Sequence, residues 1–183
     1  MWWSILAALV LALGGCAQIF GLEATTGSSD ARVDAQPMPD AAACLGGDAR
    51  SVDPGTGHCY VFFATPMIRD AARSACAGLG ATTRLASIQS ASESAVITSL
   101  IGLNDALIGG TDEVTEGTFV WDDGSPVLLA NWNTGEPNNA VGQFEEDCIV
   151  VLGSRGGVWN DVPCAPPPPP STLGTYPFVC ERD

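Results

Sequence analysis

Residues 136–164 read EPNNAVGQFEEDCIVVLGSRGGVWNDVPC, and this segment is the most informative part of the chain. Its oxygen-bearing side chains are grouped in three motifs, Glu136-Pro137-Asn138, Glu146-Asp147-Cys148 and Trp159-Asn160-Asp161. Carboxylates and amides suit hard cations, because Ca²⁺ takes about six to eight oxygen ligands and tolerates irregular geometry. The chain has seven Lys and Arg residues, so little positive charge is available to balance this acidity. The segment therefore predicts a bound divalent cation.

The net charge of the chain, −14 over 183 residues, limits its partners. A phosphate backbone needs a basic patch, so the charge argues against nucleic acid, and it argues equally against anionic lipid headgroups. Eleven of the 21 acidic residues lie between positions 105 and 161. A solvated acidic face is the alternative explanation for this clustering.

The N-terminus is predicted to be a targeting segment. Ile5–Leu13 is apolar, but it is shorter than the about 20 residues that span a bilayer. The sequence Leu13-Gly14-Gly15-Cys16 resembles a bacterial lipobox, so residues 1–16 are interpreted as a lipoprotein signal peptide with Cys16 lipidated. Residues 1–4 carry no Lys or Arg, and an ordinary signal peptide that removes Cys16 is the alternative. Either way we expect an exported protein; as a lipoprotein it would be anchored to a bacterial membrane, at the outer membrane or cell surface.

Residues 17–43 are rich in Thr, Ser, Asp, Ala and Pro and contain few large apolar side chains. Such a composition cannot bury a core, so we expect a disordered tether. The folded domain is then predicted to occupy residues 44–183.

Six cysteines remain once Cys16 is set aside, and an even number in an exported domain predicts three disulfides. Six cysteines permit 15 connectivities, and the residues alone do not choose among them. Zinc is a competing interpretation, weakened by the lack of a Cys-x-x-Cys pair and by the single histidine, His58. We interpret His58 as a surface residue at the start of a strand.

Two predicted helices precede a β-rich half, which indicates an α+β fold. Thr65-Pro66 predicts the start of a helix that ends at Gly78. Ser90 with Glu93 forms a capping box for a second helix that ends at Gly102. Short β-type runs follow, namely Leu107-Ile108, Thr118–Trp121, Ile149–Leu152 and Phe178–Cys180.

Residues 122–143 have almost no regular periodicity. Loops of this length are uncommon in compact domains unless they are functional. We expect a metal to supply the order that this loop does not obtain from a core.

Several further motifs lie between Cys44 and Cys180, in addition to the three motifs of residues 136–164. They are Cys59-Tyr60, Leu85-Ala86-Ser87-Ile88, Ile108-Gly109-Gly110-Thr111-Asp112-Glu113, Gly117–Trp121, Asn131-Trp132 and Phe178–Glu181. With these motifs in this order, the chain from Cys44 to Cys180 resembles a C-type lectin-like domain of the long form. The resemblance implies a C-type lectin fold with two helices, antiparallel β-sheets and a long Ca²⁺-binding loop. It also implies the pairings Cys44–Cys59, Cys76–Cys180 and Cys148–Cys164.

The resemblance implies one principal Ca²⁺ ion that also takes part in carbohydrate binding. The implied ligands of both the ion and the sugar are Glu136, Asn138, Glu146, Asn160 and Asp161, with Pro137 in the cis form. Two vicinal sugar hydroxyls would complete the coordination, each also bonding a carboxylate and an amide of this set. The Glu-Pro-Asn order is similar to members that prefer mannose, N-acetylglucosamine or fucose, whereas galactose-preferring members have Gln-Pro-Asp.

A second, auxiliary Ca²⁺ is implied at Asp112, Glu116, Asn139, Glu146 and Asp147. The chain departs from the family there, because Asn139 is neutral where an aspartate is common. The loop to Glu145 is also about two residues longer than in near members. A further departure is the five-proline run 166–170, which we interpret as a stiff surface loop, with a docking site for a partner as the alternative.

The function expected from this reasoning is Ca²⁺-dependent glycan binding by a membrane-tethered lectin. The alternative is a protein-binding adhesion or scaffolding module of the same fold, with Ca²⁺ structural or absent. An enzyme is not expected, because one histidine and no cofactor loop leave no catalytic constellation. Trp132 and Trp159 are expected to be core residues.

Overall fold

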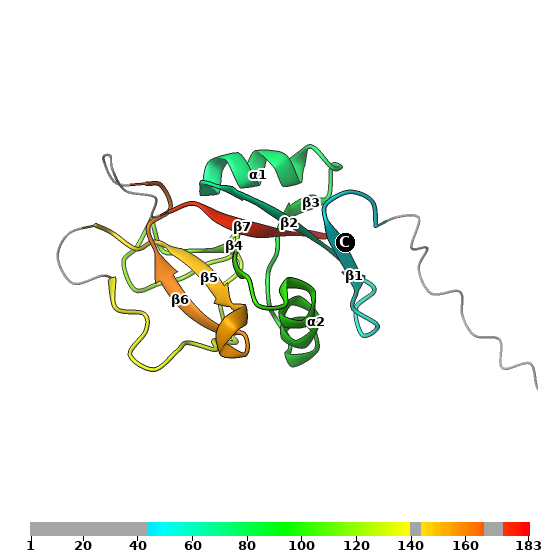
Figure 1. The fold of residues 1–183 in the computed structure, drawn as a ribbon. Helices are drawn as coiled ribbons and strands as arrows, with labels where there is room; N and C mark the ends of the chain where they lie inside the picture. The colour runs from blue at the N-terminus through cyan, green and yellow to red at the C-terminus, as the bar shows by residue number, and fades with distance from the viewer. Residues whose placement is uncertain (1–43, 140–143, 167–173) are drawn as a thin grey trace, which may run out of the picture. The chain divides into compact units, whose positions relative to one another are not determined.

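The computed structural model describes residues 44–139, 144–166 and 174–183, which form two helices and one sheet (Figure 1). The predicted signal peptide, Cys16, the tether and Pro167–Pro170 lie outside these described residues. Among the described residues, no helix has the length and apolar character needed to cross a bilayer.

Seven strands form the sheet, in the order β1-β2-β7-β4-β5-β6, with β3 also paired to β7. The final strand enters between β2 and β4, and it runs antiparallel to β2 but parallel to β4. The expectation of an α+β fold is confirmed, but the sheet is mixed rather than wholly antiparallel. The strands are β1 Ala49–Val52, β2 Cys59–Met67, β3 Thr83–Leu85, β4 Asp105–Thr111, β5 Cys148–Leu152, β6 Val158–Val162 and β7 Tyr176–Arg182.

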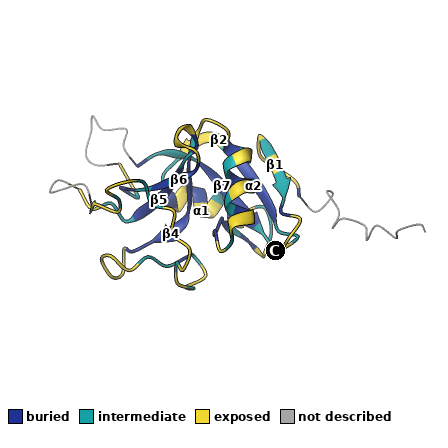
Figure 2. Ribbon diagram, turned by 90° about the horizontal axis from the view of Figure 1, so that it is seen from below, coloured by how far each residue is buried: buried dark blue, intermediate teal, exposed yellow. Residues whose placement is uncertain are grey.

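Side chains alternate between the two faces of the sheet along each strand, and each face packs into its own cluster of buried residues. In β2, Tyr60 and Phe62 belong to the cluster that contains Ile97 of the second helix, whereas Val61 packs with Ala72 and Cys76 of the first. Figure 2 shows the central strands buried and the loops exposed. Each large apolar side chain buried in this way contributes about 1.5–3 kcal/mol to stability, and the sheet is thereby a firm base for the loops.

The first helix, α1, spans Arg69–Ala77, so the predicted start at Thr65-Pro66 is wrong. The chain remains extended there because Met67 pairs with Tyr176 of β7 after a register shift. The N-cap is Ile68, whose backbone is extended.

The second helix, α2, spans Ala91–Ile101 and confirms the predicted capping box. The Ser90 side chain accepts from the backbone N–H of Glu93 at 3.2 Å. The Glu93 carboxylate in turn accepts from the backbone N–H of Gln89, one residue before the expected partner.

The three disulfides pair as the resemblance implied, Cys44–Cys59, Cys76–Cys180 and Cys148–Cys164. The second joins α1 to β7, and the third joins β5 to the segment that follows β6. One predicted strand, Thr118–Trp121, is wrong. Val120 makes only isolated bridges to Thr111 and Pro126, because a tight turn follows at once.

Candidate functional site

Asp161 is the central residue of the loop region, and it lies within β6 rather than on a turn. The residue is 1% exposed. Its Oδ2 atom accepts hydrogen bonds from the backbone N–H groups of Asn138 at 2.9 Å and Asn139 at 2.7 Å. Its Oδ1 atom is buried and has no hydrogen-bond partner among the residues that the structure describes. One carboxylate oxygen therefore anchors the loop to the sheet, and the other lacks the partner that a buried charged atom normally has.

Glu136 lies beside this carboxylate. The Glu136–Pro137 peptide bond is cis, as the resemblance implied. Burial raises the pKa of Glu136, the Asp161 carboxylate raises it further, and the hydrogen bond from the Asn138 amide lowers it. Two carboxylates close enough to perturb each other repel when both are ionised, so this pair suits a shared cation.

Glu146 and Asn160 are linked to the same group through the backbone. The backbone N–H of Glu146 donates to Oδ1 of Asn139 at 2.8 Å, and the Asn160 amide donates to the backbone carbonyl of Asp161 at 2.8 Å. The structure thus brings Glu136, Asn138 and Asp161 into direct side-chain proximity. It connects the other two expected ligands to them by hydrogen bonds.

A second acidic cluster contains Glu116, Glu145 and Asp147, each with a carboxylate oxygen within 4.8 Å of the others. Asp112 lies next to them and is 4% exposed, with an Oδ1 atom that is buried and unpartnered. Burial first, and then neighbouring carboxylates, raise the pKa values of Asp112, Glu116 and Asp147. The donor set and the unbalanced negative charge of both clusters fit a hard cation such as Ca²⁺.

Glu145 was not among the residues predicted for this cluster, whereas Asn139 was. The Asn139 amide donates to Glu145 Oε2 at 2.9 Å while its carbonyl accepts from Glu146, so this side chain joins two parts of the loop. The acidic run Glu145-Glu146-Asp147 did indicate that Glu145 could join a cation site. Because the loop before it is longer than in near members, the sequence did not show which of these carboxylates would converge.

One side chain of the long loop, Trp132, packs onto the domain core, so the expectation that the loop obtains no order from a core is wrong. The ring of Trp132 lies 5.7 Å from that of Trp159 and 4.9 Å from that of Phe119. The backbone of Trp159 bonds to the loop on both sides of Trp132, accepting from Asn133 and donating to Asn131. Trp159 is wholly buried and Trp132 partly buried, which agrees with their expected packing role.

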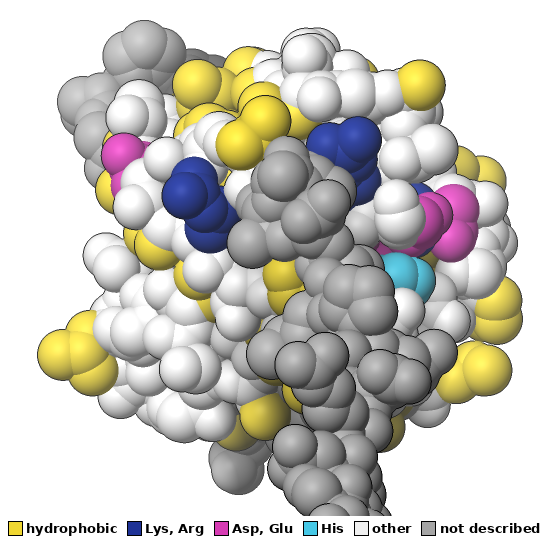
Figure 3. Space-filling model, turned by 90° about the vertical axis from the view of Figure 1, so that its right-hand side faces the viewer, with side chains coloured by type: hydrophobic (Ala, Val, Ile, Leu, Met, Phe, Trp, Pro, Cys, Tyr) yellow, Lys and Arg dark blue, Asp and Glu magenta, His cyan; other side chains and the backbone are white. Residues whose placement is uncertain are grey.

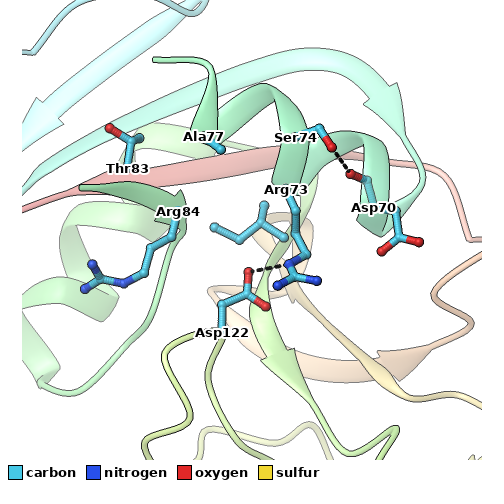
Figure 4. A pocket seen from close by; sticks show the side chains of 8 residues that line it. Asp70, Arg73, Ser74, Ala77, Thr83, Arg84 and Asp122 are labelled. Atoms are coloured by element: carbon cyan, nitrogen blue, oxygen red, sulfur yellow. Dashed lines mark hydrogen bonds and ion pairs between the residues drawn. The ribbon is translucent and has the colours of Figure 1, made fainter. Parts of the chain in front are cut away.

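A separate cavity of about 400 Å³ lies between α1, β3 and Asp122 (Figure 4). Arg73 points toward Asp122, and Arg69 also pairs with this carboxylate. The guanidinium of Arg84 instead pairs with Asp183 at 2.7 Å. Arg73, Arg84 and Asp122 of the lining are thus engaged in ion pairs, which indicates a structural role for these groups.

Comparisons with known proteins show which domains this chain is similar to. The family model described as Lectin C-type domain matches residues 65–182. The mouse (Mus musculus) low affinity immunoglobulin epsilon Fc receptor is 45% identical over 106 residues, which are 58% of this chain and 30% of the receptor. The chain therefore spans less than a third of that relative's length.

Two solved structures extend the comparison. The C-type carbohydrate-recognition domain of cow CD23, determined in the presence of a GlcNAc2Man3 oligosaccharide, is 36% identical with a TM-score of 0.57, covering 68% of this chain and 87% of that one. A calcium-independent type II antifreeze protein is 25% identical with a TM-score of 0.59, covering 75% of this chain and 94% of that one. The structures similar to this chain therefore include a protein that is calcium-independent.

Proposed function

The chain belongs to the C-type lectin domain family, and from that premise we propose that it binds glycans through a Ca²⁺ ion. The observation that carries the proposal is the buried, unpartnered Oδ1 of Asp161 beside the Glu136 carboxylate. A cation there would supply the missing partner and remove the repulsion between the two groups. The residues that would hold it are Glu136, Asn138, Glu146, Asn160 and Asp161.

The ion would supply neutralisation and open coordination positions, since three carboxylates and Ca²⁺ leave a local charge of about −1. The protein's own residues then orient the sugar. Glu136 and Glu146 would accept hydrogen bonds from two vicinal hydroxyls, and the amides of Asn138 and Asn160 would donate hydrogen bonds to the hydroxyl oxygens. The hydrogen bond between Asn138 and Glu136 supports this role, because it holds one donor and one acceptor side by side.

The proposed ligands are glycans with an equatorial hydroxyl pair, of the mannose, N-acetylglucosamine or fucose type. The Glu-Pro-Asn order supports this choice, and so does the GlcNAc2Man3 oligosaccharide in whose presence the cow CD23 domain was determined. A weaker auxiliary Ca²⁺ is proposed at Asp112, Glu116, Asn139, Glu146 and Asp147, to which we add Glu145. The convergence of three carboxylates supports it.

A protein-binding module is the second candidate, with Ca²⁺ structural or absent. The name of the mouse relative describes a receptor for an immunoglobulin Fc region, which is a protein ligand. The calcium-independent antifreeze protein shows that the ion is not general to this fold.

Glycan-array binding with and without a chelator separates the two functions. A Ca²⁺-dependent lectin should bind at about millimolar Ca²⁺ and lose that binding with EDTA, because the ion itself contacts the hydroxyls. Binding that survives chelation, or no glycan binding with Ca²⁺ present, would support the protein-binding module.

Exchanging the motif tests how the sugar is chosen. The double variant Glu136→Gln/Asn138→Asp should change the preference from mannose-type glycans toward galactose. The exchange places a hydrogen-bond donor at position 136 and an acceptor at position 138, which reverses the present order. We expect the ratio of the mannose affinity to the galactose affinity to change by about tenfold or more, corresponding to about 1.4 kcal/mol. Competition with free mannose and free galactose measures this ratio, and an unchanged ratio would mean that this motif does not determine the sugar specificity.

Acid should weaken the effect of Ca²⁺. The pKa of Glu136 is raised in the folded protein. Without the ion, this group therefore stabilises the folded state at pH values below its unfolded pKa, and that stabilisation is lost as the pH rises through the folded pKa. Ca²⁺ requires the ionised form, so the increase in melting temperature caused by Ca²⁺ should be largest near neutral pH and should shrink on acidification. Scans with Ca²⁺ and with EDTA from about pH 7.5 to about pH 4, near the ordinary carboxylate pKa, measure this increment. A constant increment would contradict the assignment.

Lipid attachment at Cys16 and export stay predictions from the sequence. Cells fed a clickable fatty acid should label the wild-type protein, and Cys16→Ser should not be labelled. Equal labelling of both proteins would exclude the proposed anchor.

A further inference from the structure

Outside the calcium loops, His58, Glu93 and Glu181 converge on one point. They come from the residue before β2, the first turn of α2 and the strand β7, yet the imidazole Nδ1 and a carboxylate oxygen from each glutamate lie within 4.8 Å of one another. His58 lies at the surface directly before β2, as the sequence predicted, with its side chain 30% exposed, but its Nδ1 atom also contacts two buried acids. Figure 3 shows the histidine at the surface with acidic side chains beside it.

Each glutamate has one oxygen held by the protein. Oε2 of Glu181 accepts from the backbone N–H and the hydroxyl of Ser87, at 2.8 and 2.7 Å. Oε2 of Glu93 accepts from the backbone N–H of Gln89 at 2.7 Å. The Oε1 atoms lie 2.8 Å (Glu181) and 3.7 Å (Glu93) from Nδ1 of His58. Hydrogen bonds that orient carboxylates in this way are typical of the surroundings of metal ligands.

The histidine nitrogen lacks a hydrogen bond. Among the described residues, Nδ1 is buried and makes ion-pair contacts to the two Oε1 atoms, but it has no hydrogen-bond partner. A buried nitrogen without a hydrogen bond, beside two buried carboxylates, points to a ligand that the three residues share.

The charge of the cluster is also unbalanced. Arg84 approaches Glu181 to 3.5 Å, but its guanidinium makes two hydrogen bonds to Asp183, at 2.7 and 2.9 Å. Burial, and then the negative charges of Glu181 and Glu93, raise the pKa of the buried Tyr60 hydroxyl. Two glutamates that are 4% and 1% exposed therefore share little positive charge, an arrangement that is costly unless a cation is present.

We propose that His58, Glu93 and Glu181 bind a divalent transition-metal ion, with Zn²⁺ as the best match. An imidazole nitrogen and two carboxylates form a three-ligand Zn²⁺ site with an open position, whereas Ca²⁺ prefers oxygen donors alone. The ion neutralises both carboxylates and links α2 to the sheet. This site is independent of the loop residues and of the proposed glycan function.

A titration on the full chain tests the site. The protein carries no histidine tag, its free thiols are alkylated, and about millimolar Ca²⁺ is kept present to saturate loop sites. Calorimetry should find one Zn²⁺ per chain, and Co²⁺ as a spectroscopic substitute should give a visible absorption band.

Three variants locate the ion. His58→Gln should weaken Zn²⁺ binding by at least about 100-fold and remove the Co²⁺ band, and Ser87→Ala should weaken binding by about tenfold, because it loosens Glu181. Asp70→Asn, in the first turn of α1 and outside both clusters, should leave both readouts unchanged. Circular dichroism and the melting temperature check that each variant is folded.

Three results would overturn the proposal. The first is the absence of Zn²⁺ binding by the folded wild-type chain, which would mean that His58 and Glu181 form an ion pair only. The second is Zn²⁺ binding that His58→Gln does not weaken. The third is Ca²⁺ bound at the two glutamates in preference to Zn²⁺.

Discussion

Asp161→Asn is expected to weaken Ca²⁺ binding by at least about 100-fold, because it removes one of three charged ligands. Glycan binding should be lost with the ion. The Ca²⁺-free fold should keep its stability or gain some. The amide oxygen can accept from the backbone of Asn138 and Asn139 as Oδ2 does now, and the amide nitrogen in place of Oδ1 removes a negative charge near the Glu136 carboxylate.

Calorimetry with Ca²⁺ and urea unfolding in EDTA measure these two effects separately. Asp123→Asn is the matched control, since the side chain of that aspartate accepts hydrogen bonds from Ser125 and should not change Ca²⁺ affinity. An Asp161→Asn protein that still binds Ca²⁺ at wild-type affinity would remove Asp161 from the ligand set. A variant that unfolds in EDTA would show instead that its two backbone hydrogen bonds require a charged acceptor.

Loss of the Cys76–Cys180 disulfide is expected to cost the most stability. This bond closes 104 residues, against 16 for Cys148–Cys164. Loop-closure entropy predicts about 4.7 kcal/mol for a loop of that size and about 3 kcal/mol for the shorter one. Paired Cys→Ala variants, compared by urea unfolding in EDTA, test the order of these two losses.

Ca²⁺ affinity should show the opposite order. Cys148 directly follows Asp147 and pairs with Val162, next to Asp161, so loss of the shorter disulfide should disturb the ligands more. Loss of the longer one should leave Ca²⁺ affinity nearly unchanged in any molecule that remains folded. Equal losses of affinity in both variants would contradict the separation of scaffold and loop.

Local sequence signals predicted the elements they encode directly. Ser90 and Glu93 specified the start of α2, because capping depends on neighbours in sequence. The start of α1 was predicted too early, because a pairing with Tyr176, more than 100 positions away, keeps Met67 in the sheet. The strand position of Trp159-Asn160-Asp161 was missed for the same reason, since its hydrogen bonds go to β5.

Oxygen donors, cysteines and the Glu136-Pro137-Asn138 motif can be recognised in the sequence, so the family and the chemical types of the proposed ligands were predictable from it. The sequence did not reveal which oxygen of Asp161 lacks a partner or that Glu145 joins the acidic cluster. Nor did it reveal that His58, Glu93 and Glu181 lie together. Burial and hydrogen-bond satisfaction depend on neighbours in space, and the fold brings the start of β2, the first turn of α2 and β7 together although they are far apart along the chain.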